Sequence, residues 1–132
     1  MIEVRPTEII DKVFSKIEMT RKNSGVIYMF TSPKCAGCKT IKEMIARNKP
    51  KELEKVRLVE IDVTKELREH EKKLYEKASR KVVRTYNVNP VIKAVVEKSP
   101  IEAKLTPVIT TENAKKVGVS YNDLIRIARE IG

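Results

Sequence analysis

Both cysteines of the chain lie in one tetrapeptide, CAGC at residues 35–38, and two thiols at this spacing can close and open an internal disulfide. The segment VIYMF at residues 26–30 precedes them and is typical of a strand, which the residues TSP at 31–33 end. After the cysteines, Ile41 and Ile45 recur at helical spacing. The pattern therefore predicts that the cysteines lie where a strand turns into a helix, with the first of them at the helix N-terminus.

The two thiols are expected to have different roles. The unpaired N–H groups and the positive dipole end of a helix stabilise a thiolate, so Cys35 is predicted to be the exposed nucleophile with the lower pKa. Lys34 and Lys39 add positive charge nearby. Cys38 lies one turn further on, is expected to face inward, and can attack a mixed disulfide to release the product.

Two segments of the sequence carry a family resemblance. VIYMFTSPKCAGCKTIKEM at residues 26–44 resembles the active-site strand, loop and helix of the thioredoxin superfamily, and LTPVIT at residues 105–110 resembles its cis-proline segment. The resemblance implies a cis peptide bond before Pro107, a position beside the cysteine loop, and a role for the Thr106 backbone in pairing with an extended substrate. Lys34 stands where thioredoxins have a tryptophan, which makes it a third candidate substrate-binding residue.

The resemblance also has departures. Thioredoxins hold a buried aspartate six residues before the first cysteine, and this chain has Met29 there. The lysine that partners this aspartate aligns near Leu58, so apolar residues replace both members of the pair together. Thioredoxins are thought to use the buried acid to deprotonate the second cysteine. Without it, we expect resolution by Cys38 to be slow near neutral pH and to accelerate as the pH rises.

The order of elements predicts a single α/β domain over residues 1–132. By resemblance it is a thioredoxin-like three-layer α/β/α domain with a mixed central sheet, and the insert at about residues 89–105 precedes the cis-proline strand. The expected elements are strands at 1–4, 26–30, 56–63, 106–110 and 115–120, and helices from Thr7, at 36–48 and 65–86, between Pro90 and Pro100, and from a capping box at 120–123.

Composition limits the function classes. The 132 residues carry a formal net charge of +10, which favours polyanions, but acidic and basic residues are interleaved, so only weak non-specific nucleic-acid binding is expected. No segment is apolar enough to span a membrane, and we expect a cytoplasmic location. The charged share of 35% and the absence of glutamine are typical of thermophilic proteins.

Three functions are weighed for the cysteine pair. The favoured one is an enzyme, a thiol–disulfide oxidoreductase that reduces protein disulfides without a cofactor and takes electrons from an unknown thiol or reductase. A structural zinc site is disfavoured because it needs four ligands, and the chain has two cysteines and His70, on a charged helix. The remaining alternative is a thioredoxin-fold adaptor that binds protein or nucleic acid, in which the disulfide is structural or regulatory.

Overall fold

The computed structural model describes residues 25–132, and these contain a mixed four-stranded sheet in the order β2-β1-β3-β4. β1 (Val26–Thr31) pairs in parallel with β2 (Arg57–Asp62) and antiparallel with β3 (Val108–Thr111), and β4 (Val117–Gly118) continues antiparallel to β3. The predicted combination of a parallel pair with a C-terminal hairpin is confirmed. The strand expected at residues 1–4 and the helix expected from Thr7 lie outside the described residues.

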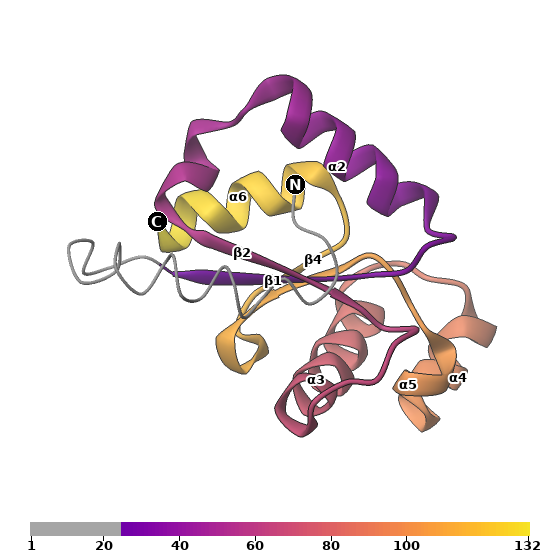
Figure 1. The fold of residues 1–132 in the computed structure, drawn as a ribbon. Helices are drawn as coiled ribbons and strands as arrows, with labels where there is room; N and C mark the ends of the chain where they lie inside the picture. The colour runs from indigo at the N-terminus through magenta and orange to yellow at the C-terminus, as the bar shows by residue number, and fades with distance from the viewer. Residues whose placement is uncertain (1–24) are drawn as a thin grey trace.

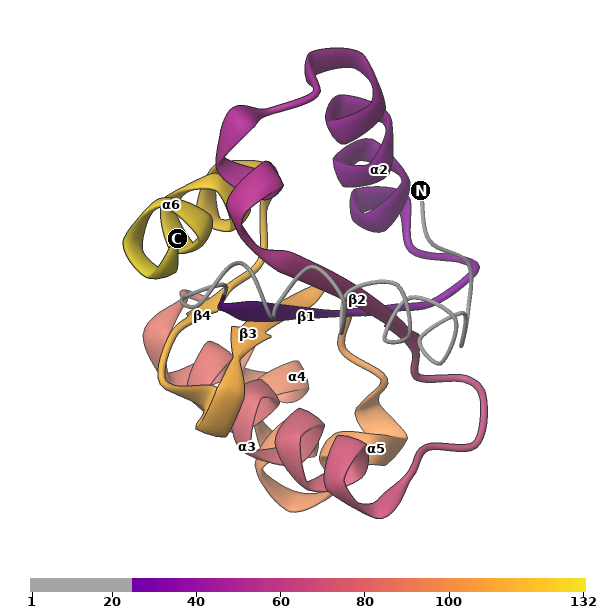
Figure 2. The ribbon, with the colours of Figure 1, turned by 60° about the vertical axis from the view of Figure 1, so that its left-hand side comes forward.

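Helices cover both faces of this sheet (Figure 1). α2 (Ala36–Asn48) and α6 (Tyr121–Ile131) lie on one face, and α3 (Glu69–Thr85), α4 (Pro90–Lys98) and α5 (Pro100–Ala103) lie on the other. Figure 2 shows the same two groups of helices separated by the strands. The described residues therefore form a mixed α/β structure with helix layers above and below the sheet.

Each face of the sheet has its own apolar core, because successive side chains of β1 point to opposite faces. Ile27 and Met29 pack with Ile41 of α2 and Leu124 of α6, whereas Phe30 packs with Tyr75 of α3. All of these side chains are at most 2% exposed. The central strand thus contributes to both cores at once.

Two predicted elements, the third helix and the second hairpin strand, have other boundaries in the structure. The helix expected at 65–86 begins only at Glu69. Asp62 first holds a turn by accepting hydrogen bonds from the backbone N–H and hydroxyl of Thr64 at 2.8 and 2.6 Å. At the helix start, the Glu71 carboxylate accepts from the Arg68 N–H at 2.8 Å. The helix expected between Pro90 and Pro100 is confirmed as α4, and Pro100 starts the further short helix α5. The second strand of the hairpin is only two residues long.

The capping box expected at residues 120–123 is replaced by a different arrangement. Ser120 Oγ accepts a hydrogen bond from the Asp123 N–H at 3.2 Å, as predicted for an N-cap. The Asp123 carboxylate, however, accepts from the Val119 N–H at 2.9 Å. Asp123 therefore fastens the end of the hairpin to the first turn of α6.

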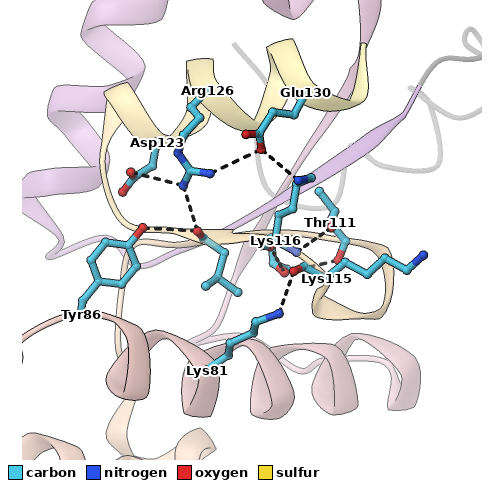
Figure 3. A network of polar contacts seen from close by, with 10 residues as sticks. Lys81, Tyr86, Thr111, Lys115, Lys116, Asp123, Arg126 and Glu130 are labelled. Atoms are coloured by element: carbon cyan, nitrogen blue, oxygen red, sulfur yellow. Dashed lines mark hydrogen bonds and ion pairs between the residues drawn. The ribbon is translucent and has the colours of Figure 1, made fainter.

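A polar network joins α3, β4 and α6 at this end of the hairpin (Figure 3). The Val117 carbonyl accepts from Tyr86 Oη at 3.3 Å and from Arg126 Nη2 at 3.4 Å. Lys81 Nζ donates to the Lys115 carbonyl at 2.7 Å. A strand of two residues has few ladder hydrogen bonds of its own, so these side chains supply partners for its backbone.

The Asp123 carboxylate belongs to this network and its ionisation is perturbed. Burial raises its pKa, but the hydrogen bonds from the Val119 N–H, Ser120 and Tyr86, with the charge of Arg126, outweigh burial and leave the pKa below its ordinary value. A carboxyl group with a lowered folded-state pKa stabilises the fold above its unfolded pKa. That contribution is lost as the pH falls through the folded value.

We predict that Asp123→Asn lowers the free energy of unfolding at pH 7 by about 1 to 2 kcal/mol. This is the typical contribution of a hydrogen bond to a charged group, reduced because solvent screens the partly exposed carboxylate. The difference from the unsubstituted protein should shrink as the pH falls below about 4. Denaturant unfolding from pH 3 to 7 measures both effects. Glu52→Gln, which removes an ion pair with the exposed Arg129 outside this network, is the control and should change little. A loss for Asp123→Asn that stays constant down to pH 3 would contradict this assignment.

Candidate functional site

The two cysteines form a disulfide at the start of α2, at the end of the loop that leaves β1. Cys35 is the N-cap residue of α2, and its Sγ accepts a hydrogen bond from the Cys38 N–H at 3.0 Å. Its own N–H donates to the Ser32 carbonyl at 3.2 Å, which closes the turn out of the strand. The predicted position of the pair at a strand-to-helix junction is confirmed.

The burial of the two cysteines corrects one expectation. The sequence predicts an exposed Cys35, but in the disulfide this residue is only 8% exposed, against 2% for Cys38. The cause is the hydrogen bond that turns Cys35 Sγ onto the first turn of the helix. Cys35 is therefore the more exposed of two largely buried residues, and Cys38 is buried against the core as predicted.

The segment before β3 lies against the cysteine loop. The Thr106-Pro107 peptide bond is cis, as the sequence resemblance implies. Ser32 Oγ and Thr106 Oγ1 share a hydrogen bond at 3.2 Å. A Cβ on Gly37 would lie 3.3 Å from Pro107 Cδ, so the backbone between the cysteines approaches the proline ring closely. The structure thus brings four predicted site residues together, namely Cys35, Cys38, Thr106 and Pro107.

Lys34, the remaining predicted site residue, is exposed next to Cys35. Lys39, on the first turn of α2, is exposed as well. Both side chains place positive charge on the surface around the disulfide, in accordance with the expectation from the sequence. A substrate-binding role for Lys34 remains a prediction.

Tyr75 holds the proline segment from the opposite side of the sheet, and sequence reasoning did not find it. Its hydroxyl donates to the Leu105 carbonyl at 2.7 Å, one residue before Thr106, and its ring packs on Phe30 with centroids 4.9 Å apart. Burial raises the pKa of Tyr75 well above its ordinary value, so the hydroxyl stays a donor at any physiological pH. The sequence feature that could have identified it is a tyrosine at one of the few apolar positions of a polar helix.

Glu60 of β2 is a second residue that the sequence pattern did not reveal. The strand register pairs Ile27 with Leu58 and Met29 with Glu60, so an acid that is only 2% exposed lies beside the methionine. Its Oε2 accepts from Thr31 Oγ1 at 2.9 Å and forms an ion pair with Lys42 of α2. Positions 29 and 58 are apolar as expected, but β2 places the buried carboxylate of Glu60 two residues after Leu58, in register with Met29.

A shallow groove of about 330 Å³ begins at Gly37, between the two cysteines. It runs between α2 and the turn that leads into α6. Its lining includes Ile41, Met44, Val119 and Tyr121. The disulfide is thus next to a hollow with room for a side chain of an approaching polypeptide.

No three histidine, cysteine or acidic side chains within residues 25–132 lie close enough together to hold a metal ion. His70 is exposed on the first turn of α3. Within the same residues, none of the helices is long and apolar enough to cross a membrane.

Comparisons of the chain with protein-family models, with curated proteins and with solved structures find no significant match.

Because the Cys38 N–H and the helix N-terminus both stabilise negative charge on Cys35 Sγ, we predict that the Cys35 thiol of the reduced protein has a lowered pKa. In the variant Cys38→Ser, we expect Cys35 to be alkylated by iodoacetamide with a midpoint pH below the value of about 8.5 for a free cysteine. In Cys35→Ser, the remaining Cys38 should react more slowly and only at higher pH, because burial disfavours its thiolate. Alkylation rates from pH 5 to 10, measured by mass spectrometry, test this order. Equal midpoints for the two variants would refute it.

Proposed function

We propose that this protein is a thioredoxin-like thiol–disulfide oxidoreductase that reduces disulfide bonds of other proteins. One observation carries the proposal: Cys35 Sγ, at the N-terminus of α2, accepts a hydrogen bond from the Cys38 N–H while bonded to Cys38. The same backbone group remains available to stabilise a Cys35 thiolate once the bond is reduced. The contact of Gly37 with Pro107 adds support, because it places a second backbone segment beside the reactive sulfurs.

The reaction depends on the different surroundings of the two thiols. The Cys35 thiolate attacks one sulfur of a substrate disulfide, forms a mixed disulfide, and releases the first substrate thiolate, which takes up a proton. Cys38 then loses its proton and attacks Cys35 Sγ, which forms the internal disulfide and releases the second substrate thiolate. Two electrons pass from the protein dithiol to the substrate, and a separate thiol or reductase must return them.

Three features next to the disulfide suit an extended polypeptide substrate. Thr106 is only partly buried and lies one residue before Pro107 and the start of β3, so its backbone is in a position to pair with an added chain. The groove that begins at Gly37 offers apolar contacts from Ile41 and Met44. Lys34 adds an exposed positive charge at the entrance. These features favour protein disulfides over small disulfides as substrates.

The second candidate function is an adaptor in which the disulfide is structural or regulatory. The surface of α4 favours it. Val91, Ile92 and Val95 are 71%, 44% and 42% exposed, and these are the large apolar side chains that the described residues leave open to solvent. Exposed apolar patches often mark protein interaction sites. A partner on α4 is also compatible with an oxidoreductase that recruits particular substrates.

Turnover separates the two functions. We predict that the unsubstituted protein accelerates the reduction of insulin disulfides by dithiothreitol, measured as turbidity, because it cycles between dithiol and disulfide. Cys35→Ser should abolish the acceleration. Cys38→Ser should accumulate mixed disulfides with insulin, visible on non-reducing gels, because the resolving thiol is missing.

The substitution Ser99→Ala, far from the cysteines in sequence and at the start of α5, is the matched control and should leave the acceleration unchanged. If insulin reduction proceeds at the rate of dithiothreitol alone, the adaptor function is favoured instead. If Cys35→Ser traps mixed disulfides and Cys38→Ser does not, the roles of the two thiols are reversed.

A further inference from the structure

One face of α4 carries large apolar side chains that the described part of the chain leaves open to solvent. They belong to Val91, Ile92 and Val95, and Val91 is 71% exposed. Val91 lies four residues before Val95 and Ile92 lies three before it, so the three side chains are neighbours on the helix surface. We call them the α4 strip. A contiguous apolar patch is a better indication of an interaction site than scattered apolar residues are.

The α4 strip is exposed although the helix itself is firmly attached. Asn89 caps α4 by accepting a hydrogen bond from the Val91 N–H at 2.8 Å. Val96 is fully buried. Arg80 of α3 donates to the Glu97 carbonyl at 3.2 Å. The side of α4 that carries these last two residues therefore faces the body of the molecule, and the strip is held in place on the outer side.

The charges that α4 itself places around the strip are basic. Lys93 and Lys98 are exposed, and Lys98 lies three residues after Val95, at the end of the strip. The acidic residue of α4, Glu97, accepts two hydrogen bonds from the Arg84 guanidinium at 2.8 Å. Its negative charge is therefore compensated by α3, whereas the two lysines remain at the surface.

The elements packed against α4 do not reverse this positive charge. From α3, the charged groups that face α4 are Arg80 and Arg84, and both are basic. On α5, the exposed residues Glu102 and Lys104 carry opposite charges. The surroundings of the strip thus combine exposed apolar side chains with an excess of positive charge.

This combination determines which partner fits the strip. A second copy would bring an equally basic strip on a chain of net charge +10, and like charges oppose such an association. The strip also lies within one short helix, whereas a stable interface buries about 800 Å² on each partner. A partner with carboxylates around its own apolar residues has complementary charge, which favours encounter and correct register.

We propose that the α4 strip is the docking surface for a partner protein that presents an amphipathic helix with an apolar face flanked by aspartate or glutamate. The helix of the partner covers Val91, Ile92 and Val95, and its carboxylates pair with Lys93 and Lys98. This inference goes beyond the proposed function, because it assigns a contact surface distinct from the disulfide, and it holds for an oxidoreductase and for an adaptor alike.

The test titrates nitrogen-15-labelled protein with two synthetic helical peptides. The acidic peptide contains alanine, leucine and glutamate, with the leucines at helical spacing. The basic peptide has lysine at every glutamate position. We expect the acidic peptide to shift the amide signals of α4 and of the neighbouring residues of α3 and α5. Signals of α2 and α6, on the other face of the sheet, should stay in place, and the basic peptide should shift none of these signals.

A pair of variants tests the apolar contact. Val91→Ser combined with Val95→Ser changes two exposed side chains, so the fold should be retained. The affinity for the acidic peptide should fall by roughly tenfold, because two apolar side chains no longer leave water on binding. Ile125→Ser, at a partly exposed position of α6, is the matched apolar control and should leave the affinity unchanged.

A second pair separates docking at the strip from general attraction to a basic protein. Lys98→Glu should weaken binding of the acidic peptide by roughly threefold, because a charge at the rim of the contact is reversed. Lys51→Glu makes the same change in net charge at an exposed position after the end of α2 and should weaken binding less. Equal losses in these two variants would overturn the proposal, because only the total charge would then matter.

Three further results would overturn it. They are equal binding of the two peptides, the absence of α4 shifts at millimolar acidic peptide, and full affinity in the double serine variant. Shifts of α4 signals that depend on protein concentration without any peptide would identify a second copy as the occupant and would also overturn the proposal. The titration involves no disulfide exchange, so its outcome is independent of the insulin assay and of the proposed function.

Discussion

The central position of β1 is the constraint on which the rest of the structure depends. In the described sheet, β1 pairs over six residues with β2 in parallel and over four residues with the antiparallel β3. Its alternate side chains enter the two cores, and Phe30 and Met29 are both fully buried. The strand is therefore held in position and in register by contacts from both faces and both edges. The loop that follows its last residue therefore starts from a fixed position.

This loop carries the cysteines. Thr31 ends the strand, and the turn closed by the Ser32 carbonyl delivers Cys35 to the start of α2. Neighbouring elements then hold the same few residues: Glu60 bonds to Thr31, and Thr106 bonds to Ser32. The two sulfurs lie at a junction of three chain segments, each anchored in the sheet.

The helix layer on the opposite face of the sheet, formed by α3, α4 and α5, helps to position the disulfide indirectly. Tyr75 spans from α3 to the Leu105 carbonyl, and this bond fixes the segment that reaches the cysteines from below. The same layer carries α4, which is tied to α3 by the two hydrogen bonds between Arg84 and Glu97 at 2.8 Å and yet exposes most of its apolar side chains. A helix that is firmly attached but little buried gives the molecule a second surface, distinct from the disulfide.

The sequence by itself determined the local features of this protein. A β-branched and aromatic run, a turn and an amphipathic run are enough to place Cys35 and Cys38 at a strand-to-helix junction. Ser120 is enough to start the last helix, because capping depends on residues three positions apart. The tertiary structure decided the rest. Side chains far apart in the chain, such as Glu60 and Lys42, or Tyr75 and Leu105, meet only through strand register and helix packing, which local periodicity does not encode. The length of β4 and the delayed start of α3 likewise depended on hydrogen bonds that competed with the local pattern.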